Sequence, residues 1–285
     1  MMKIAIISDI HGNIHALEAV LEDLKAKNVD TIIANGDLIN RGPASCEVLS
    51  RIKEEAEVAI LGNHDDLIRK WGSRDPDLPE TWFDDPIWQS TANIAECLTD
   101  KGWIEYLKNL PMSHTIDIDG MPKIIVSHGS PNHYSEGYAH DVPEKTLKTI
   151  IEEHPADIYI SSYTHEPWER TIEGKVFLNT GAVGTPFNGN PQAQYLVLEK
   201  DGNAWAHSFC SVEYDKKAAL DAFYESGFIN KGGLSATIFH EELRRSSPLF
   251  DNFRKWADTQ RLDTTWNSWT SFKHAFPEKF TLLWC

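Results

Sequence analysis

The first sixty residues alternate short apolar runs with amphipathic stretches, and this alternation limits the folds open to the chain. Residues 3–8 (KIAIIS) form a continuous apolar run rich in β-branched residues, which is typical of a strand buried on both faces. Leucines and valines then recur at helical spacing along one face of residues 14–27. The pattern repeats as a strand at 30–35, a helix near 45–56 and a strand at 58–61. This β-α-β-α-β order predicts parallel strands whose functional loops open at one edge of a sheet.

The rest of the chain predicts further strands, one insertion and a helical ending. Tryptophans and prolines in residues 69–110 indicate an irregular helical insertion, which serves either as a small core or as an aromatic wall beside a site. The later strands are expected at 112–118, 123–127, 157–161, 176–179, 194–198 and 204–212, the last of them in a second sheet. We expect residues 1–212 to form the main domain and residues 213–285 a helical accessory segment packed on it.

Composition excludes several classes of protein. The net charge of −16 over 285 residues argues against nucleic-acid and anionic-membrane partners, although metal ions can still create a local site for phosphate. No apolar run is long enough to span a membrane, and the first residues do not resemble a signal peptide. The cysteines (Cys46, Cys97, Cys210 and Cys285) are scattered, which is typical of reduced thiols in a cytoplasmic protein.

Five short segments with oxygen or imidazole donors follow predicted strands. They are Asp9-Ile10-His11, Gly36-Asp37, Gly62-Asn63-His64-Asp65, Ser127-His128-Gly129 and Thr164-His165. Taken alone, each is a weak signal, since a histidine after a strand is usually a loop residue and Asp9 is also suited to capping a helix. Together they are improbable by chance. Mixed Asp and His donors suit Mn, Fe or Zn better than Mg or Ca.

These motifs resemble those of the calcineurin-like metallophosphoesterases, whose pattern is D-x-H, GD, GNH[DE], a lone His and GHxH. The resemblance spans most of residues 1–200 and implies a four-layer α-β-β-α sandwich of two facing mixed sheets. The loop NTGAVGTPFNGNP (179–191) is similar to one in bacterial phosphodiesterase-like members, or is simply a supporting turn. The ending, with EYD and FYESGF, loosely resembles that of dinucleoside tetraphosphate hydrolases.

The resemblance also implies a role for each site residue. Asp9, His11 and His165 would hold one metal ion, Asn63 and His128 a second, and Asp37 would bridge the two. Asn63 would also contact the substrate. His64 would donate a proton to the leaving oxygen, and Asp65 would orient the His64 ring. The metals expected are Mn or Fe, with Zn as an alternative.

The chain departs from the family pattern at SYTHEP, where Ser162 and Tyr163 replace the Gly and first His of GHxH. Three interpretations remain open for Tyr163. Its phenolate coordinates the second metal, or its side chain points away and water or substrate completes that site, or the second site is mostly empty and activity is low.

The segment GDLINRGP (36–43) supplies Arg41, which the resemblance assigns to a two-pronged contact with phosphate; a surface salt bridge is the alternative. In related branches an Asp stands where this chain has Asn40. The expected activity is hydrolysis of a phosphodiester or pyrophosphate bond by metal-activated water, with a nucleotide-type substrate such as a dinucleoside polyphosphate. The alternatives are a phosphomonoesterase, a protein phosphatase, and a ligand-binding member with weak turnover. Four aromatic residues are candidates to stack on a base, unless they pack in a core: Trp82, Trp88, Tyr134 and Trp168.

Overall fold

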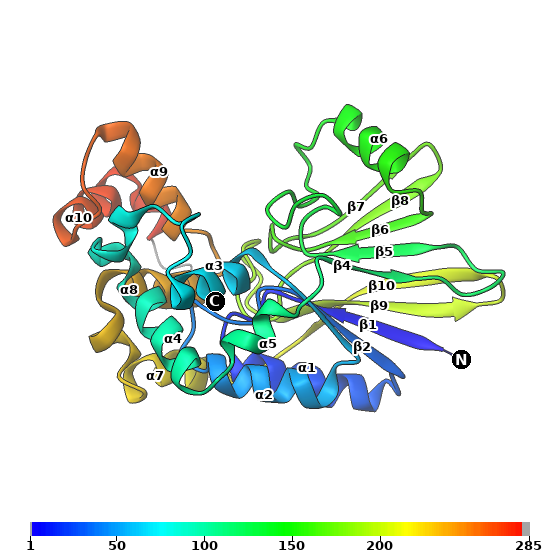
Figure 1. Cartoon of the computed structure of the whole chain (residues 1–285), viewed down its shortest axis with the longest axis horizontal. Coiled ribbons are helices and arrows are strands. Elements are labelled where there is room, and N and C mark those ends of the chain that lie inside the picture. Colours follow the sequence, from blue (N-terminus) through cyan, green and yellow to red (C-terminus); the bar gives the residue numbers. More distant parts are fainter. Residues whose placement is uncertain (1, 281–285) are drawn as a thin grey trace.

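Two five-stranded mixed sheets lie face to face in the computed structural model, which describes residues 2–280 (Figure 1). The first sheet has the order β10-β9-β1-β2-β3, formed by β1 (Lys3–Ile7), β2 (Thr31–Asn35), β3 (Val58–Ile60), β9 (Ala193–Asp201) and β10 (Ala204–Val212). The second has the order β4-β5-β6-β8-β7, formed by β4 (Ser113–Ile116), β5 (Ile124–Ser127), β6 (Ile158–Ser161), β7 (Pro167–Ile172) and β8 (Lys175–Thr180). Strands β1, β2 and β3 are parallel, as predicted.

The apolar run of β1 is buried on both faces, and its alternation shows how the layers meet. Ile4 and Ile6 point into a core between the two sheets, together with Val126 and Ile160 of the second sheet. Ala5 and Ile7 belong to a separate core on the opposite face of the first sheet, because side chains alternate along a strand. The first sheet is therefore covered on both sides, which is why β1 is entirely apolar after Lys3.

Helices cover the two outer faces. Helices α1 (Ile14–Ala26) and α2 (Ser45–Glu55) pack on the first sheet, and α6 (Glu144–Glu153) packs on the second (Figure 1). The predicted α-β-β-α sandwich is confirmed. Within residues 2–280, every helix is too short or too polar to cross a lipid bilayer.

Two strand predictions need correction. β7 was not predicted, because only Trp168 and Ile172 are buried in this edge strand and its apolar pattern is weak. β10 joins the first sheet rather than the second. The turn between Asp201 and Ala204 is tight, so β10 folds back antiparallel on β9.

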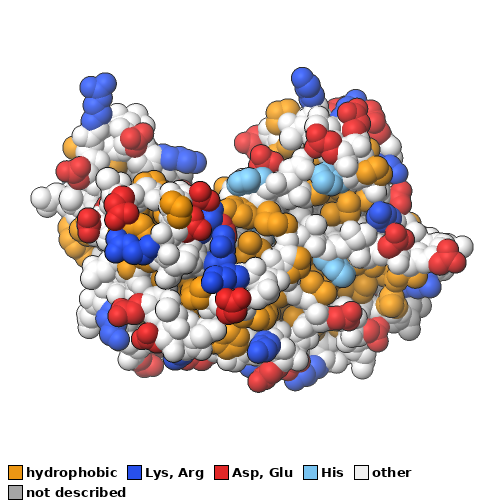
Figure 2. Space-filling model, in the orientation of Figure 1, with side chains coloured by type: hydrophobic (Ala, Val, Ile, Leu, Met, Phe, Trp, Pro, Cys, Tyr) orange, Lys and Arg blue, Asp and Glu red, His pale blue; other side chains and the backbone are white. Residues whose placement is uncertain are grey.

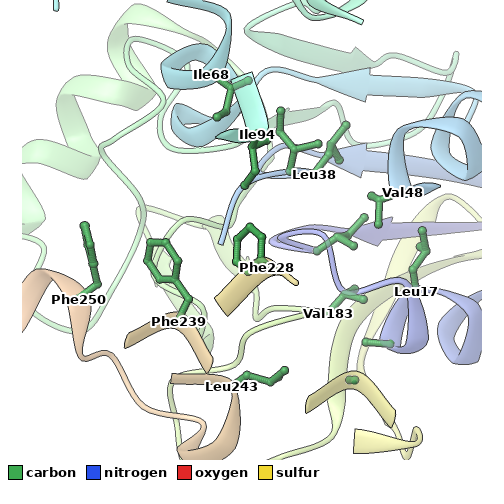
Figure 3. Close-up of a cluster of buried hydrophobic side chains, with 14 of the residues drawn as sticks. Leu17, Leu38, Val48, Ile68, Ile94, Val183, Phe228, Phe239, Leu243 and Phe250 are labelled. Carbon is green, nitrogen blue, oxygen red and sulfur yellow. The ribbon is translucent and has the colours of Figure 1, made fainter. Parts of the chain in front are cut away.

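The insertion and the chain ending form one helical lobe, which we define as residues 63–110 and 213–280. The insertion contains α3 (Asn63–Ser73), α4 (Gln89–Asp100), α5 (Ile104–Lys108) and two 3₁₀ turns, Glu80–Phe83 and Pro86–Trp88. The ending contains α7 (Lys216–Glu225), α8 (Phe228–Arg245), α9 (Phe250–Gln260), α10 (Trp266–Ala275) and the 3₁₀ turn Pro277–Lys279. Figure 3 shows Ile68 and Ile94 of the insertion in the same core cluster as Phe228 and Phe239 of the ending. Cys285 lies outside the described residues.

Candidate metal centre

The carboxyl ends of β1, β2, β3, β5 and β6 meet at one edge, which brings the five donor segments together as expected. Backbone hydrogen bonds join the first two loops, since Asp9 N donates to Gly36 O (3.1 Å) and His11 N donates to Asp37 O (3.0 Å). The β3 loop lies against the same place. A Cβ atom at Gly62 would overlap the backbone nitrogen of Asp37, so only glycine allows this approach.

Four buried side chains form the first donor cluster, with ligand atoms all within 4.8 Å of one another: Asp9, His11, Asp37 and His165. His165 Nε2 is 3.1 Å from Asp9 Oδ1 and 3.4 Å from His11 Nε2. His11 Nε2 is 3.5 Å from Asp37 Oδ2. This is the residue set expected for the first metal together with the bridging carboxylate.

A second donor cluster shares Asp37 with the first. His128 Nε2 is 3.1 Å from Asn63 Oδ1 and 3.5 Å from Asp37 Oδ2. The same Asp37 oxygen is thus 3.5 Å from an imidazole nitrogen on each side, His11 in one cluster and His128 in the other. A single carboxylate oxygen between two donor clusters has the placement that a bridging ligand requires.

The three cluster histidines are held in the same orientation. Each places Nδ1 on a backbone carbonyl, which can only accept, so Nδ1 carries a proton and Nε2 is the atom that faces the centre. The bonds run from His11 to Ile39 O (3.1 Å), from His128 to Asn35 O (2.8 Å) and from His165 to Thr185 O (2.6 Å). Phe187 stacks on the His165 ring at 4.2 Å, so the loop 179–191 acts as a support for this histidine. Sequence reasoning did not identify these carbonyl partners, because any residue type can supply one.

The charges and lone pairs of the centre fit bound cations. Asp9 Oδ1 is buried without a hydrogen-bond partner in the described residues. Burial would raise the pKa of Asp37, but His128 and His64 hold it well below its usual value, so the carboxylate is ionised. Burial would lower the pKa of His128, but Asp37 and Asp9 raise it to about 10, so in the absence of a metal ion this imidazole supplies the positive charge that the buried carboxylates need. The residues therefore fit metal ions.

His64 lies beside the donor clusters and contacts residues from the β2 loop. Its Nδ1 is 2.9 Å from the side-chain nitrogen of Asn40, and its Nε2 accepts from Arg41 Nε at 3.3 Å. Burial lowers the pKa of the His64 imidazole to about 4. The charge of Asp37 opposes this shift, and the charge of Arg41 adds to it. The ring is therefore neutral at pH 7.

The expectation that Asp65 orients His64 is wrong. One Asp65 oxygen accepts from the backbone N–H of Leu38 (3.0 Å) and of Ile39 (3.3 Å), and the other accepts from Gly62 N (3.0 Å). Asp65 is the third residue of α3 and turns back to its start, as in a capping box. The residue at His64 Nδ1 is Asn40, at the position where the sequence departs from GDxxDRG.

Arg41 is buried, and its terminal guanidinium nitrogens are already paired with carboxylates. The expectation that Arg41 makes a two-pronged contact with phosphate is therefore corrected. Its Nη1 donates to Glu242 Oε2 at 2.7 Å and its Nη2 lies 3.5 Å from Asp251 Oδ2. Glu242 also accepts from Leu249 N and Phe250 N at the start of α9, both at 2.8 Å. The accessory segment therefore fixes Arg41 against His64.

Tyr163 lies next to the second cluster. Its ring meets the His128 ring edge-on at 6.1 Å, and the side chain is 37% exposed. Among residues 2–280 its hydroxyl has no hydrogen-bond partner. Burial, followed by the charges of Asp251 and Asp37, raises the pKa of its phenol, which favours the neutral form.

A cavity of about 550 Å³ opens over the donor clusters. Its walls come from the β-strand loops, from the insertion through Trp82 and Trp88, and from the accessory segment through Asp251 and Arg254. Figure 2 shows the surface hollowed between the helical lobe and the sheets, with basic and acidic side chains mixed on its helical side. Trp88 is largely buried, so Trp82 is the more accessible of these two tryptophans for stacking on a base.

A two-sheet sandwich with paired Asp/His donor clusters at its strand ends defines a metallophosphoesterase-type site. The model of the calcineurin-like phosphoesterase family matches residues 2–167, and the chain belongs to that family. It is therefore a hydrolase, and the predicted family assignment is confirmed.

Relatives of this chain support the bacterial phosphodiesterase-like branch. An uncharacterized protein of Methanocaldococcus jannaschii is 27% identical over 76% of this chain and 90% of its own length. Phosphodiesterase YfcE of Escherichia coli K12 is 26% identical over 70% of this chain and 89% of its own length. A symmetrical bis(5'-nucleosyl)-tetraphosphatase of Chromohalobacter salexigens is 26% identical over 61% of this chain and 64% of its own length. A metallophosphoesterase crystal structure from Sphaerobacter thermophilus aligns with a TM-score of 0.67 at 25% identity, over 86% of this chain and all of that one.

Proposed function

We propose that this protein hydrolyses a phosphodiester or pyrophosphate bond in a nucleotide-type substrate, such as a dinucleoside polyphosphate, at a site for two metal ions. The observation that carries the proposal is the Asp37 oxygen 3.5 Å from His11 on one side and from His128 on the other. The names of two relatives, a phosphodiesterase and a dinucleoside tetraphosphatase, support the same substrate class.

We assign Asp9, His11 and His165 to one ion, Asn63 and His128 to the other, and Asp37 to both. Mn, Fe or Zn suits this donor set, and two such ions would supply charge against phosphoryl oxygens and would lower the pKa of a bound water. For Tyr163 we favour a neutral phenol that does not coordinate, with water or substrate completing the second site, because burial raises the pKa of this hydroxyl.

The protein's own residues then position the substrate and move the proton. Asn63, at the first turn of α3, reaches both the cavity and the second cluster, so we assign it to substrate contact as well as metal binding. Arg41 Nε holds His64 Nε2 at the cavity wall. Because His64 is neutral at pH 7, we assign it to take up a proton from solvent and pass that proton to the leaving oxygen, rather than to supply a stored one.

We further assign residues 1–212 to the catalytic domain and residues 213–285 to an accessory segment on it. The described cysteines (Cys46, Cys97 and Cys210) are free, which supports a reducing, cytoplasmic location.

The test combines metal analysis with two chromogenic substrates. We expect about two ions per chain and faster Mn-dependent hydrolysis of bis-p-nitrophenyl phosphate than of p-nitrophenyl phosphate. Asp37→Asn should lose both metal and activity, whereas His207→Asn, on the exposed strand β10, should lose neither. Faster monoester hydrolysis would favour a phosphomonoesterase, and one ion or none without turnover would favour a binding protein.

A further inference from the structure

Four basic side chains line the cavity over the donor clusters, and two of them are already neutralised. They are Arg41, Lys70, Arg254 and Lys255. Arg41 pairs with Glu242 and Asp251, as described above.

Lys70, in α3, pairs with Asp66 at 3.3 Å and with Asp77 at 3.1 Å. Across residues 2–280, no carboxylate lies within ion-pair distance of Arg254 or Lys255. The charge available to a ligand in this cavity therefore comes from α9.

Aromatic rings hold Arg254 in place, and among the described residues its side-chain hydrogen-bond donors have no partner. Its guanidinium lies 4.6 Å from the Trp88 ring centre and 5.7 Å from those of Trp82 and Phe250. Aromatic faces stabilise the cation and fix its plane, but they leave the N–H groups free to donate. A fixed guanidinium with free donors binds phosphate oxygens well.

The nearby carboxylate of Asp251 interacts with Arg41, Arg254 and Lys255 through their charges, but among the described residues it forms an ion pair with Arg41 alone. Asp251 and Arg254 are three residues apart on α9, but the Asp251 carboxylate is oriented to Arg41 at 3.5 Å. One cavity therefore holds two places that would attract phosphate, the donor clusters when they bind metal ions and the Arg254–Lys255 end. A ligand that uses both needs more than one anionic group.

We propose that Arg254 and Lys255 form a second phosphate subsite, which binds a phosphate group of the substrate other than the one attacked at the metal centre. The inference rests on the proposed function and narrows its substrate to nucleotides that carry a chain of two or more phosphates. It also gives the accessory segment a part in selecting the substrate.

The experiment measures binding of two inorganic probes by calorimetry at fixed free Mn²⁺: orthophosphate, which fills one site, and tripolyphosphate, which reaches two. In the wild-type protein we expect tripolyphosphate to bind about tenfold or more tightly than orthophosphate, the size expected for charge-assisted hydrogen bonds. Arg254→Gln should abolish most of this preference while leaving the Kd of orthophosphate within about twofold. Glutamine keeps a stem on Trp88, so the fold should be retained, as circular dichroism would check.

Lys273→Gln is the matched control. Lys273 also lies over an aromatic ring, Trp269 at 5.9 Å, but it does not line the cavity, so its loss should leave both affinities unchanged. The proposal is overturned if wild type shows no preference for tripolyphosphate, if Arg254→Gln keeps the preference, or if it weakens both probes equally. Failure of the proposed function would appear separately, as no hydrolysis of bis-p-nitrophenyl phosphate by wild type.

Discussion

Left-handed backbone is concentrated at the metal centre. Within residues 2–280, seven of the twelve non-glycine residues with positive φ lie there: Asp9, His11, Asp37, Asn40, Arg41, Tyr163 and His165. Such conformations are unfavourable for side-chain-bearing residues and persist only where surrounding contacts hold them. Here the hydrogen bonds between the β1 and β2 loops provide that restraint. The site is therefore shaped by its backbone before any ligand binds.

His64→Ala should separate catalysis from metal binding. His64 Nε2 and Nδ1 contact Arg41 and Asn40, and the metal ligands that we propose are other residues. We expect kcat to fall about a hundredfold or more, the usual effect of losing a proton-transfer group, with the metal content unchanged. Steady-state kinetics and elemental analysis of the same preparation measure both. Unchanged turnover would remove His64 from the mechanism.

Asp65→Ala should act on stability rather than on proton transfer. It removes the acceptor for Gly62, Leu38 and Ile39, and leaves buried N–H groups unpaired. We expect unfolding free energy to fall by about 2–4 kcal/mol in urea titrations. The exposed Asp119→Ala, in the β4–β5 turn, is the control and should change little. A variant of full stability with a shifted pH profile would restore Asp65 as the partner of His64.

The exchange of roles between Asp65 and Asn40 shows what the sequence can and cannot predict. GNHDD contains a helix-start signal, an acid at the third helical position, and that signal predicts Asp65 as a cap. Because adjacent residues on a helix point in different directions, Asp65 is poorly placed to reach the ring of His64. The motif alone does not show this, whereas the helix boundary at Asn63 does.

At the level of elements, strand order predicted the candidate site well. Parallel strands end at one edge, so the first three donor loops follow from the β-α-β pattern. Glu242 could not be predicted in the same way. It lies 201 residues from its partner Arg41, and nothing in the local pattern of α8 distinguishes it from Glu241.

That pair of neighbours gives a controlled test of the contact between α8 and the site. Glu242 is 1% exposed and holds Arg41 and the start of α9, whereas Glu241 pairs with Arg244 and Arg245 nearer the surface. Glu242→Gln should lower the unfolding free energy by about 3–5 kcal/mol, as expected when a buried ion pair loses one partner. It should also lower kcat, because Arg41 holds His64.

Glu241→Gln should change stability by less than about 1 kcal/mol, since its ion pairs are partly solvated. Urea titration and steady-state kinetics compare the two variants directly. Equal effects, or full activity in Glu242→Gln, would show that α8 does not support the site.

At the level of the whole molecule, the helical lobe and the first sheet share one core. Phe239 and Phe250 of the accessory segment belong to the same cluster as Leu17 and Val48, which cover the first sheet (Figure 3). The compositional change near residue 213 therefore marks a change of secondary structure. It does not mark a separate core, so the lobe and the sandwich should unfold together.

Phe239→Ala tests this cooperativity. Phe239 is 2% exposed, and its truncation should lower the free energy of global unfolding by about 3–5 kcal/mol. Tryptophan fluorescence reports mainly on the lobe, because most of the tryptophans lie in it, whereas circular dichroism reports on the whole chain. The two unfolding transitions should coincide and should shift equally. Tyr224→Ala, at a position 60% exposed in α7, should leave both transitions in place. If Phe239→Ala shifted the fluorescence transition alone, the accessory segment would be an independent folding unit, and its hold on Arg41 would not depend on the stability of the sandwich.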